Sequence, residues 1–161
     1  MSPRPRRRTV LIGAVGLALV AGLVVVGVLV AQRLGRTPQE RYCAEVVRTR
    51  PELSARLSTG VPDVLITALP LFEDLADDAP EDITDEWRTV TTAIVGLREA
   101  LAAVGADPAT YDREDPPADV DAEEQRRIDT AARVLGSQET EVALVGLDQQ
   151  ARDVCRTPLT Q

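Results

Sequence analysis

The chain has 161 residues and a formal net charge of −8, with 44% hydrophobic residues but only 2% aromatic ones. It contains no histidine, and all 18 basic residues are arginine. These absences exclude Ser-His-Asp and Cys-His catalysis, imidazole metal ligands and lysine chemistry. Four aromatic residues are too few for a row of base-stacking side chains. We therefore expect a non-catalytic protein that holds no cofactor or metal and binds no nucleic acid.

Residues 10–31 form an apolar run of 22 residues without a charge. A helix of this length spans roughly 33 Å, enough to cross the hydrocarbon core of a bilayer. Cleaved signal peptides have shorter apolar runs, and Leu29 fits a signal peptidase site poorly. Arg7 and Arg8 faintly resemble a twin-arginine signal, but an ordinary positive flank explains them more simply. The run predicts a single transmembrane helix, an uncleaved signal anchor in contact with the lipid bilayer.

The arginines around this run predict its orientation. Four arginines precede it and two follow it, so the positive-inside rule places residues 1–9 in the cytoplasm as an Arg-rich tail. Residues 32–36 then form a short linker, and residues 37–161 form an acidic extracytoplasmic domain of a cell-membrane protein. That domain has 12 arginines against 26 acidic residues, a formal charge of −14. Such a charge repels nucleic acid and favours solubility.

Small residues repeat on one face of the predicted membrane helix. Ala14, Ala18 and Gly22 are spaced by four residues, which allows two transmembrane helices to approach closely. Glycine and alanine are common in such helices, so chance spacing is the alternative explanation.

Two proline-containing helices are predicted to open the outer domain. Thr37 to Glu40 carries a capping box with Pro38 at the first helical position. This helix runs to about Arg50, where Pro51 should kink or restart it before it ends at Gly60. A second helix begins near Pro62, is kinked at Pro70 and ends at 77–80. Their expected apolar faces comprise Tyr42, Cys43, Val46, Val47, Leu53 and Leu57, then Leu65, Ile66, Leu69, Phe72 and Leu75.

The third helix has the most regular pattern in the chain. Its apolar residues step by four and three up to the stop at Gly105. They are Ile83, Trp87, Val90, Ile94, Leu97, Leu101 and Val104. Trp87 is the largest of them, and we expect it to be a core residue rather than a ligand-stacking one.

Two further helices are expected after an irregular loop over 105–120. Asp121 and Glu124 form a second capping box, and this helix stops at Gly136. Ser137 caps the last helix. The apolar residues of the two helices are Ile128, Ala131, Ala132 and Leu135, then Leu144, Leu147, Ala151, Val154 and Cys155. No stretch alternates with period two, so the sequence predicts an all-α fold, an extracytoplasmic four- to five-helix bundle.

Cys43 lies in the first predicted outer helix and Cys155 in the last. Outside the cytoplasm, two cysteines meet the redox condition for a disulfide bond. Two unrelated buried thiols are the alternative. A bridge would require the first and last outer helices to be neighbours.

The arrangement of these segments resembles uncharacterised actinobacterial single-pass membrane-anchored helical proteins. The resemblance rests on the Arg-rich start, one membrane helix, Tyr42-Cys43, the acidic stretch from Ala79 to Trp87, and the stretch from Ala151 to Cys155. It implies no activity, because none is assigned to such proteins.

Acidic residues crowd the junction of the second and third helices: Glu73, Asp74, Asp77, Asp78, Glu81, Asp82, Asp85 and Glu86. Carboxylate clusters bind Ca²⁺, but this stretch lacks the glycine and the ligand spacing of an EF-hand loop. Acidic residues also stabilise the start of a helix without any ligand. Glycosidase chemistry with paired carboxylates is less favoured, because aromatic sugar platforms are missing.

These patterns lead to one main functional expectation and one alternative. The main expectation is a non-catalytic, membrane-anchored envelope protein whose outer domain binds another envelope protein or its own copy. The alternative is a module that binds a cation or a basic ligand at the acidic junction.

Overall fold

The computed structural model describes residues 35–60 and 63–160. Their elements, in chain order, are α2 (Pro38–Leu57), α3 (Val64–Asp77), η1 (Glu81–Ile83), α4 (Thr84–Ala102), α5 (Ala122–Leu135) and α6 (Gln138–Cys155). No strand occurs among the described residues, so the all-α prediction is confirmed. The chain divides into one unit up to Thr37 and a second from Pro38 onward, and the second unit is described below.

No helix within the described ranges is long and apolar enough to cross a membrane. The predicted cytoplasmic tail (1–9), the membrane segment (10–31) and its packing face of Ala14, Ala18 and Gly22 lie outside those ranges.

Local sequence signals set the ends of the helices. The Asp121 carboxylate accepts the amides of Glu123 (2.7 Å) and Glu124 (2.9 Å), and the Glu124 carboxylate accepts the Asp121 amide (2.9 Å), completing the predicted capping box. The Ser137 hydroxyl accepts the Thr140 amide at the start of α6. Gly105, with φ of +65°, ends the turn after α4, a backbone conformation that costs glycine little.

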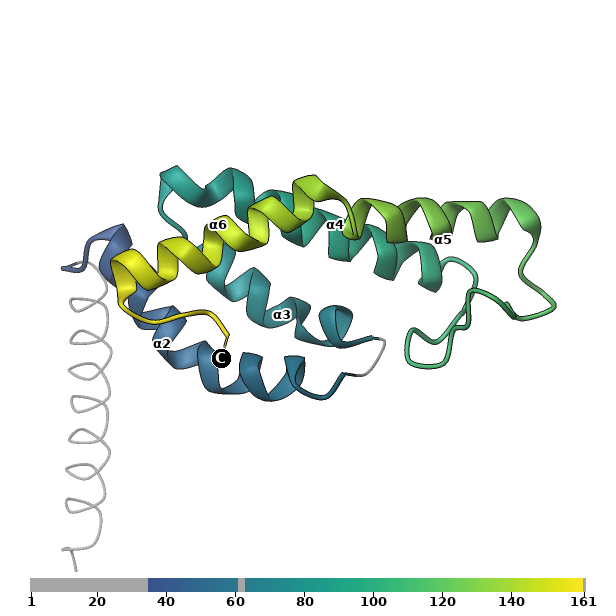
Figure 1. Cartoon of the computed structure of the whole chain (residues 1–161), viewed down its shortest axis with the longest axis horizontal. Coiled ribbons are helices and arrows are strands. Elements are labelled where there is room, and N and C mark those ends of the chain that lie inside the picture. The colour runs from purple at the N-terminus through teal and green to yellow at the C-terminus, as the bar shows by residue number, and fades with distance from the viewer. Residues whose placement is uncertain (1–34, 61–62, 161) are drawn as a thin grey trace, which may run out of the picture. The chain divides into compact units, whose positions relative to one another are not determined.

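Helix α4 is the central element, because it packs against α3, α5 and α6 (Figure 1). Its inward row follows most of the predicted pattern: Trp87, Val90, Ile94 and Leu101 are buried, and Ile83 joins them from η1. Leu97 and Val104, predicted for the same row, are only half-buried. The Trp87 ring packs between Tyr42 of α2 and Phe72 of α3, with centroid distances of 6.5 and 6.1 Å. Three of the chain's four aromatic residues therefore meet where three helices converge.

Helix α5 adds little to the main core, which it reaches through the partly buried Leu135. The Trp87 cluster, which consists of Trp87, Tyr42 and Phe72, is surrounded by α2, α3, α6 and the first part of α4. Helix α5 lies nearly end to end with α6, and both run along α4 (Figure 1). Ile128 is the one residue of α5 that is buried. The architecture is thus a bundle with one helix laid against the far half of α4.

On α2 the buried side differs in one position from the prediction. Val47 is 56% exposed, so its assignment to the apolar face was wrong, and Thr49 is buried instead. The buried residues Tyr42, Val46, Thr49 and Leu53 step by four, three and four, which turns Val47 outward. Thr49 tolerates burial because its hydroxyl donates to the Glu45 carboxylate at 2.9 Å.

Neither helical proline restarts its helix. Pro51 lies inside α2 and Pro70 inside α3, and both helices continue beyond them. The residues that follow explain this continuity, because Leu53, Leu71, Phe72 and Leu75 are buried and their packing offsets the amide bonds that proline removes.

Cys43 and Cys155 form a disulfide bond, with their Cα atoms 5.0 Å apart. The bond joins the first turns of α2 to the last turn of α6, so the predicted pairing of the first and last outer helices is confirmed. Val154, expected on the inner face, is 47% exposed in that last turn. Beyond it the chain folds back: Leu159 is buried, and its amide donates to the Asp148 carboxylate at 2.9 Å.

The position of Trp87 leads to a stability prediction. Trp87→Ala should lower the free energy of unfolding by about 3–5 kcal/mol, the usual cost of deleting a large buried aromatic. Glu99→Ala, at an exposed position of the same helix, should change it by no more than about 0.5 kcal/mol. Urea unfolding followed by circular dichroism measures both. Equal losses in the two variants would contradict the assignment of Trp87 to the core.

The disulfide closes a loop with a sequence separation of 112 residues. In the chain-entropy model a loop of this size is worth about 4–5 kcal/mol. The native protein should show no free thiol until it is reduced, and reduction should lower its melting temperature. A Cys43→Ser/Cys155→Ser variant is the control, since reductant should leave its melting temperature unchanged. Two titratable thiols in the unreduced native protein would contradict the bond.

Tyr42 predicts how stability depends on alkaline pH. Burial raises the pKa of its phenol from 10.0 to about 12. Folding therefore favours the protonated phenol, so its stabilising contribution is complete below pH 10 and is lost as pH rises toward 12. The loss should amount to roughly 2–3 kcal/mol. Chemical unfolding at a series of pH values should show a smaller alkaline loss in Tyr42→Phe than in the unmodified protein. The same loss in both would rule out Tyr42 as its source.

Candidate interaction surfaces

The eight acidic residues singled out from the sequence lie along α3, η1 and the first turn of α4. All are exposed except Asp78 and Glu86, which are half-buried. The structure thus places them along one continuous stretch of chain, but it gives them different surroundings.

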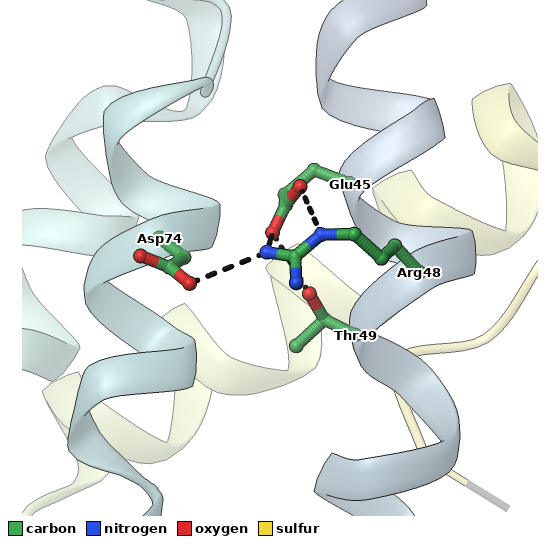
Figure 2. A network of polar contacts seen from close by, with 4 residues as sticks. All are labelled: Glu45, Arg48, Thr49 and Asp74. Atoms are coloured by element: carbon green, nitrogen blue, oxygen red, sulfur yellow. Dashed lines mark hydrogen bonds and ion pairs between the residues drawn. The ribbon is translucent and has the colours of Figure 1, made fainter.

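Two of these acidic residues are counterions within the bundle. Arg48 of α2 binds Glu45 of its own helix and reaches Asp74 of α3 at 3.3 Å (Figure 2). A second pair joins the same two helices, because Arg41 lies 3.8 Å from Asp78. We call these two pairs the arginine ladder. Arg41 precedes Arg48 along the chain, whereas its partner Asp78 follows Asp74, as expected for two antiparallel helices. Each exposed pair is worth about 0–1 kcal/mol, so the ladder sets register more than it adds stability.

A third arginine completes the contact between α2 and α3. The Arg56 guanidinium donates to the Thr67 carbonyl at 2.9 Å and also pairs with Glu52 at 2.7 Å. Thr67 lies in the turn before Pro70, where the helix lacks one amide donor. The carbonyl that loses its amide donor to Pro70 is that of Ile66, four residues earlier. The Arg56 bond to Thr67 therefore adds a link between α2 and α3 and does not replace that donor.

The remaining acidic residues do not converge on a metal site. Glu73 and Asp77 line a hollow of about 260 Å³ together with Ala76, Thr92 and Val95. Asp85 pairs with Arg88 at 2.8 Å. Within the part of the chain that the structure describes, no three acidic or cysteine side chains are placed to hold a metal ion.

A second surface, which the sequence patterns did not single out, lies on the outward side of α4. Asp85, Thr89, Thr92, Gly96 and Ala100 repeat at helical spacing opposite the buried Trp87 row, and we call them the outer row. Besides the hollow of about 260 Å³ that Thr92 shares with residues of α3, two further hollows lie beside this row. One, of about 330 Å³, is bordered by the start of α6, and the other, of about 530 Å³, by α5. We refer to the two hollows together as the α4 groove.

The groove has an apolar floor. The hydroxyls of Thr89 and Thr130 donate to the carbonyls of Asp85 and Arg126 in their own helices, at 2.9 and 2.8 Å, which leaves their methyl groups as the unengaged parts. Ala100 and Ala131 line the larger hollow. Val134, at the edge of the smaller one, is 50% exposed.

Gly96 lies at the middle of this floor. A Cβ atom added there would meet no atom within 4 Å, so packing within the domain does not require glycine. Glycine inside a helix costs about 1 kcal/mol relative to alanine. A glycine that opens onto solvent lets another backbone approach α4 closely. The sequence did contain a signal for this surface. Helix α4, which has the clearest row of core residues, carries a second row of small residues on its opposite side.

Charge differs between the two ends of the groove. The hollow beside α6 carries Asp85 and Glu139 against Arg88, whereas the hollow beside α5 carries Arg126 and Arg127 against Glu123. Arg88 and Arg127 each have an acidic neighbour in their own helix. Arg126 and Glu139 form no ion pair with any residue that the structure describes.

Comparison with known proteins identified no matching family model, no similar curated protein and no similar solved structure.

Proposed function

We propose that this protein is a non-catalytic, membrane-anchored envelope protein whose extracytoplasmic helical domain is a protein-interaction module. The observation that carries this proposal is the α4 groove, an apolar surface on the outside of the domain. Its glycine has no packing partner within the described part of the chain. Protein interfaces combine such an apolar centre with a charged rim.

The fold suits a module that presents a fixed surface. The disulfide and the Trp87 cluster hold α2, α3, α4 and α6 together, and α5 lies along α4 and contacts that core through the partly buried Leu135. Helix α5 adds one wall to the groove while contributing one buried side chain, Ile128. A helix that contributes so little to the core is explained best by the surface that it helps to build.

Two features support the proposed compartment. The arginine asymmetry around residues 10–31 favours a cytoplasmic start and an outer domain. The Cys43–Cys155 bond supports the same assignment, because disulfides persist in oxidising compartments.

A topology experiment and a crosslinking experiment together test the proposal. In intact cells, a membrane-impermeant thiol reagent should label Thr110→Cys in the exposed loop but not Ser2→Cys. A photoreactive amino acid at Gly96 should then form a covalent adduct with a protein, and the same group at Glu52, exposed on α2, should not. Labelling of Ser2→Cys would contradict the proposed compartment. Absence of any adduct at Gly96 would contradict the interaction surface, and an adduct from Glu81 alone would favour the acidic junction instead.

A further inference from the structure

We infer that the α4 groove binds the same groove of a second copy of this chain, with the two α4 helices antiparallel across a two-fold axis. This inference rests on the proposed function, and it names the partner for that surface. Three features of the groove carry it: its charge, its small central residues and its length.

The charge pattern is self-complementary. The outer row spans 16 residues of α4, about 22 Å from end to end, with an excess acidic charge at the Asp85 end and an excess basic charge at the Ala100 end. A two-fold axis near the middle of the row brings each acidic end onto the basic end of the other copy. Symmetric pairing of this kind is the commonest form of protein oligomer.

This symmetry brings together two side chains, one from each end of the groove, that form no ion pair with a described residue. Glu139 borders the acidic end and Arg126 the basic end, and neither forms an ion pair among the described residues. In the antiparallel arrangement Glu139 of one copy faces Arg126 of the other, twice per dimer.

The small residues lie where the two helices would cross. The axis falls between Thr92 and Gly96, so Thr92 of one copy lies opposite Gly96 of the other. Because a Cβ at position 96 meets nothing within 4 Å, the backbone there is open to close approach. The domain's charge of −14 opposes association in dilute solution, but anchoring in one membrane raises the effective concentration of the copies.

The test is thiol crosslinking of the full-length protein in its native membrane. Cys43 and Cys155 are bonded to each other, so they do not compete for the reagent. A short bismaleimide should convert Thr92→Cys into an adduct of twice the chain mass. Thr110→Cys, in the exposed loop, is the control and should give none. Equal dimer adducts from both positions would show association through another part of the chain and overturn the inference.

Charge reversal provides the decisive comparison. In the Thr92→Cys background, Arg126→Glu and Glu139→Arg should each reduce the dimer adduct roughly fivefold, the coupling expected for a close charge pair. The double variant should restore it, because the pair is re-formed with exchanged signs. Failure of the double variant to restore the adduct would overturn the pairing of these two residues.

A third variant separates association from folding. Gly96→Gln should abolish the adduct without lowering the melting temperature, since the added side chain enters open space in the single copy. Loss of the adduct together with a lower melting temperature would contradict that reasoning. If Thr92→Cys forms an adduct of a different mass, the partner is another protein: the dimer is overturned and the proposed function stands. If it forms no adduct of any size, both are contradicted.

Discussion

The packing of Trp87 against Tyr42 and Phe72 is the interaction on which the rest of the domain depends. The three rings come from α4, α2 and α3, so one contact fixes the relative positions of three helices. Three of the chain's four aromatic residues are in this one cluster, and aromatic side chains bury a large area each. Leu147 and Ala151 of α6 close the fourth side, and the disulfide bond ties the end of α6 to the start of α2.

This arrangement divides α4 into two faces with different roles. The inward face holds the large side chains and the stability of the bundle, while the outer row holds residues too small to contribute much to it. Helix α5 sits beside the outer row rather than over the core, and its capping box and Ile128 suffice to hold it there. The α4 groove is therefore a consequence of the fold: a fifth helix placed along a bundle leaves a long seam open to solvent.

The acidic junction shows how much a cluster in sequence depends on its surroundings. Asp74 and Asp78 lie among acidic neighbours, yet both are matched by arginines of α2 in the antiparallel ladder. Their neighbours Glu73 and Asp77 line a hollow instead and form no ion pair with an arginine in the described part of the chain. Helical geometry causes this split, because adjacent residues point about 100° apart around the axis. Acidic charge at this junction thus serves partly to hold α3 against α2.

Sequence alone determined the helical class, the ends of most helices and the core row of α4, since capping groups, glycine stops and the spacing of apolar residues act over one or two turns. It also indicated the pairing of Cys43 with Cys155, because the chain contains two cysteines. It misplaced Val47 and overlooked Thr49, because whether a threonine can be buried depends on a partner such as Glu45. The ladder of arginines between α2 and α3, the small share of α5 in the core and the α4 groove were decided by tertiary structure alone. Each depends on which helices lie side by side, and a linear pattern carries no information about the neighbour that a residue will meet.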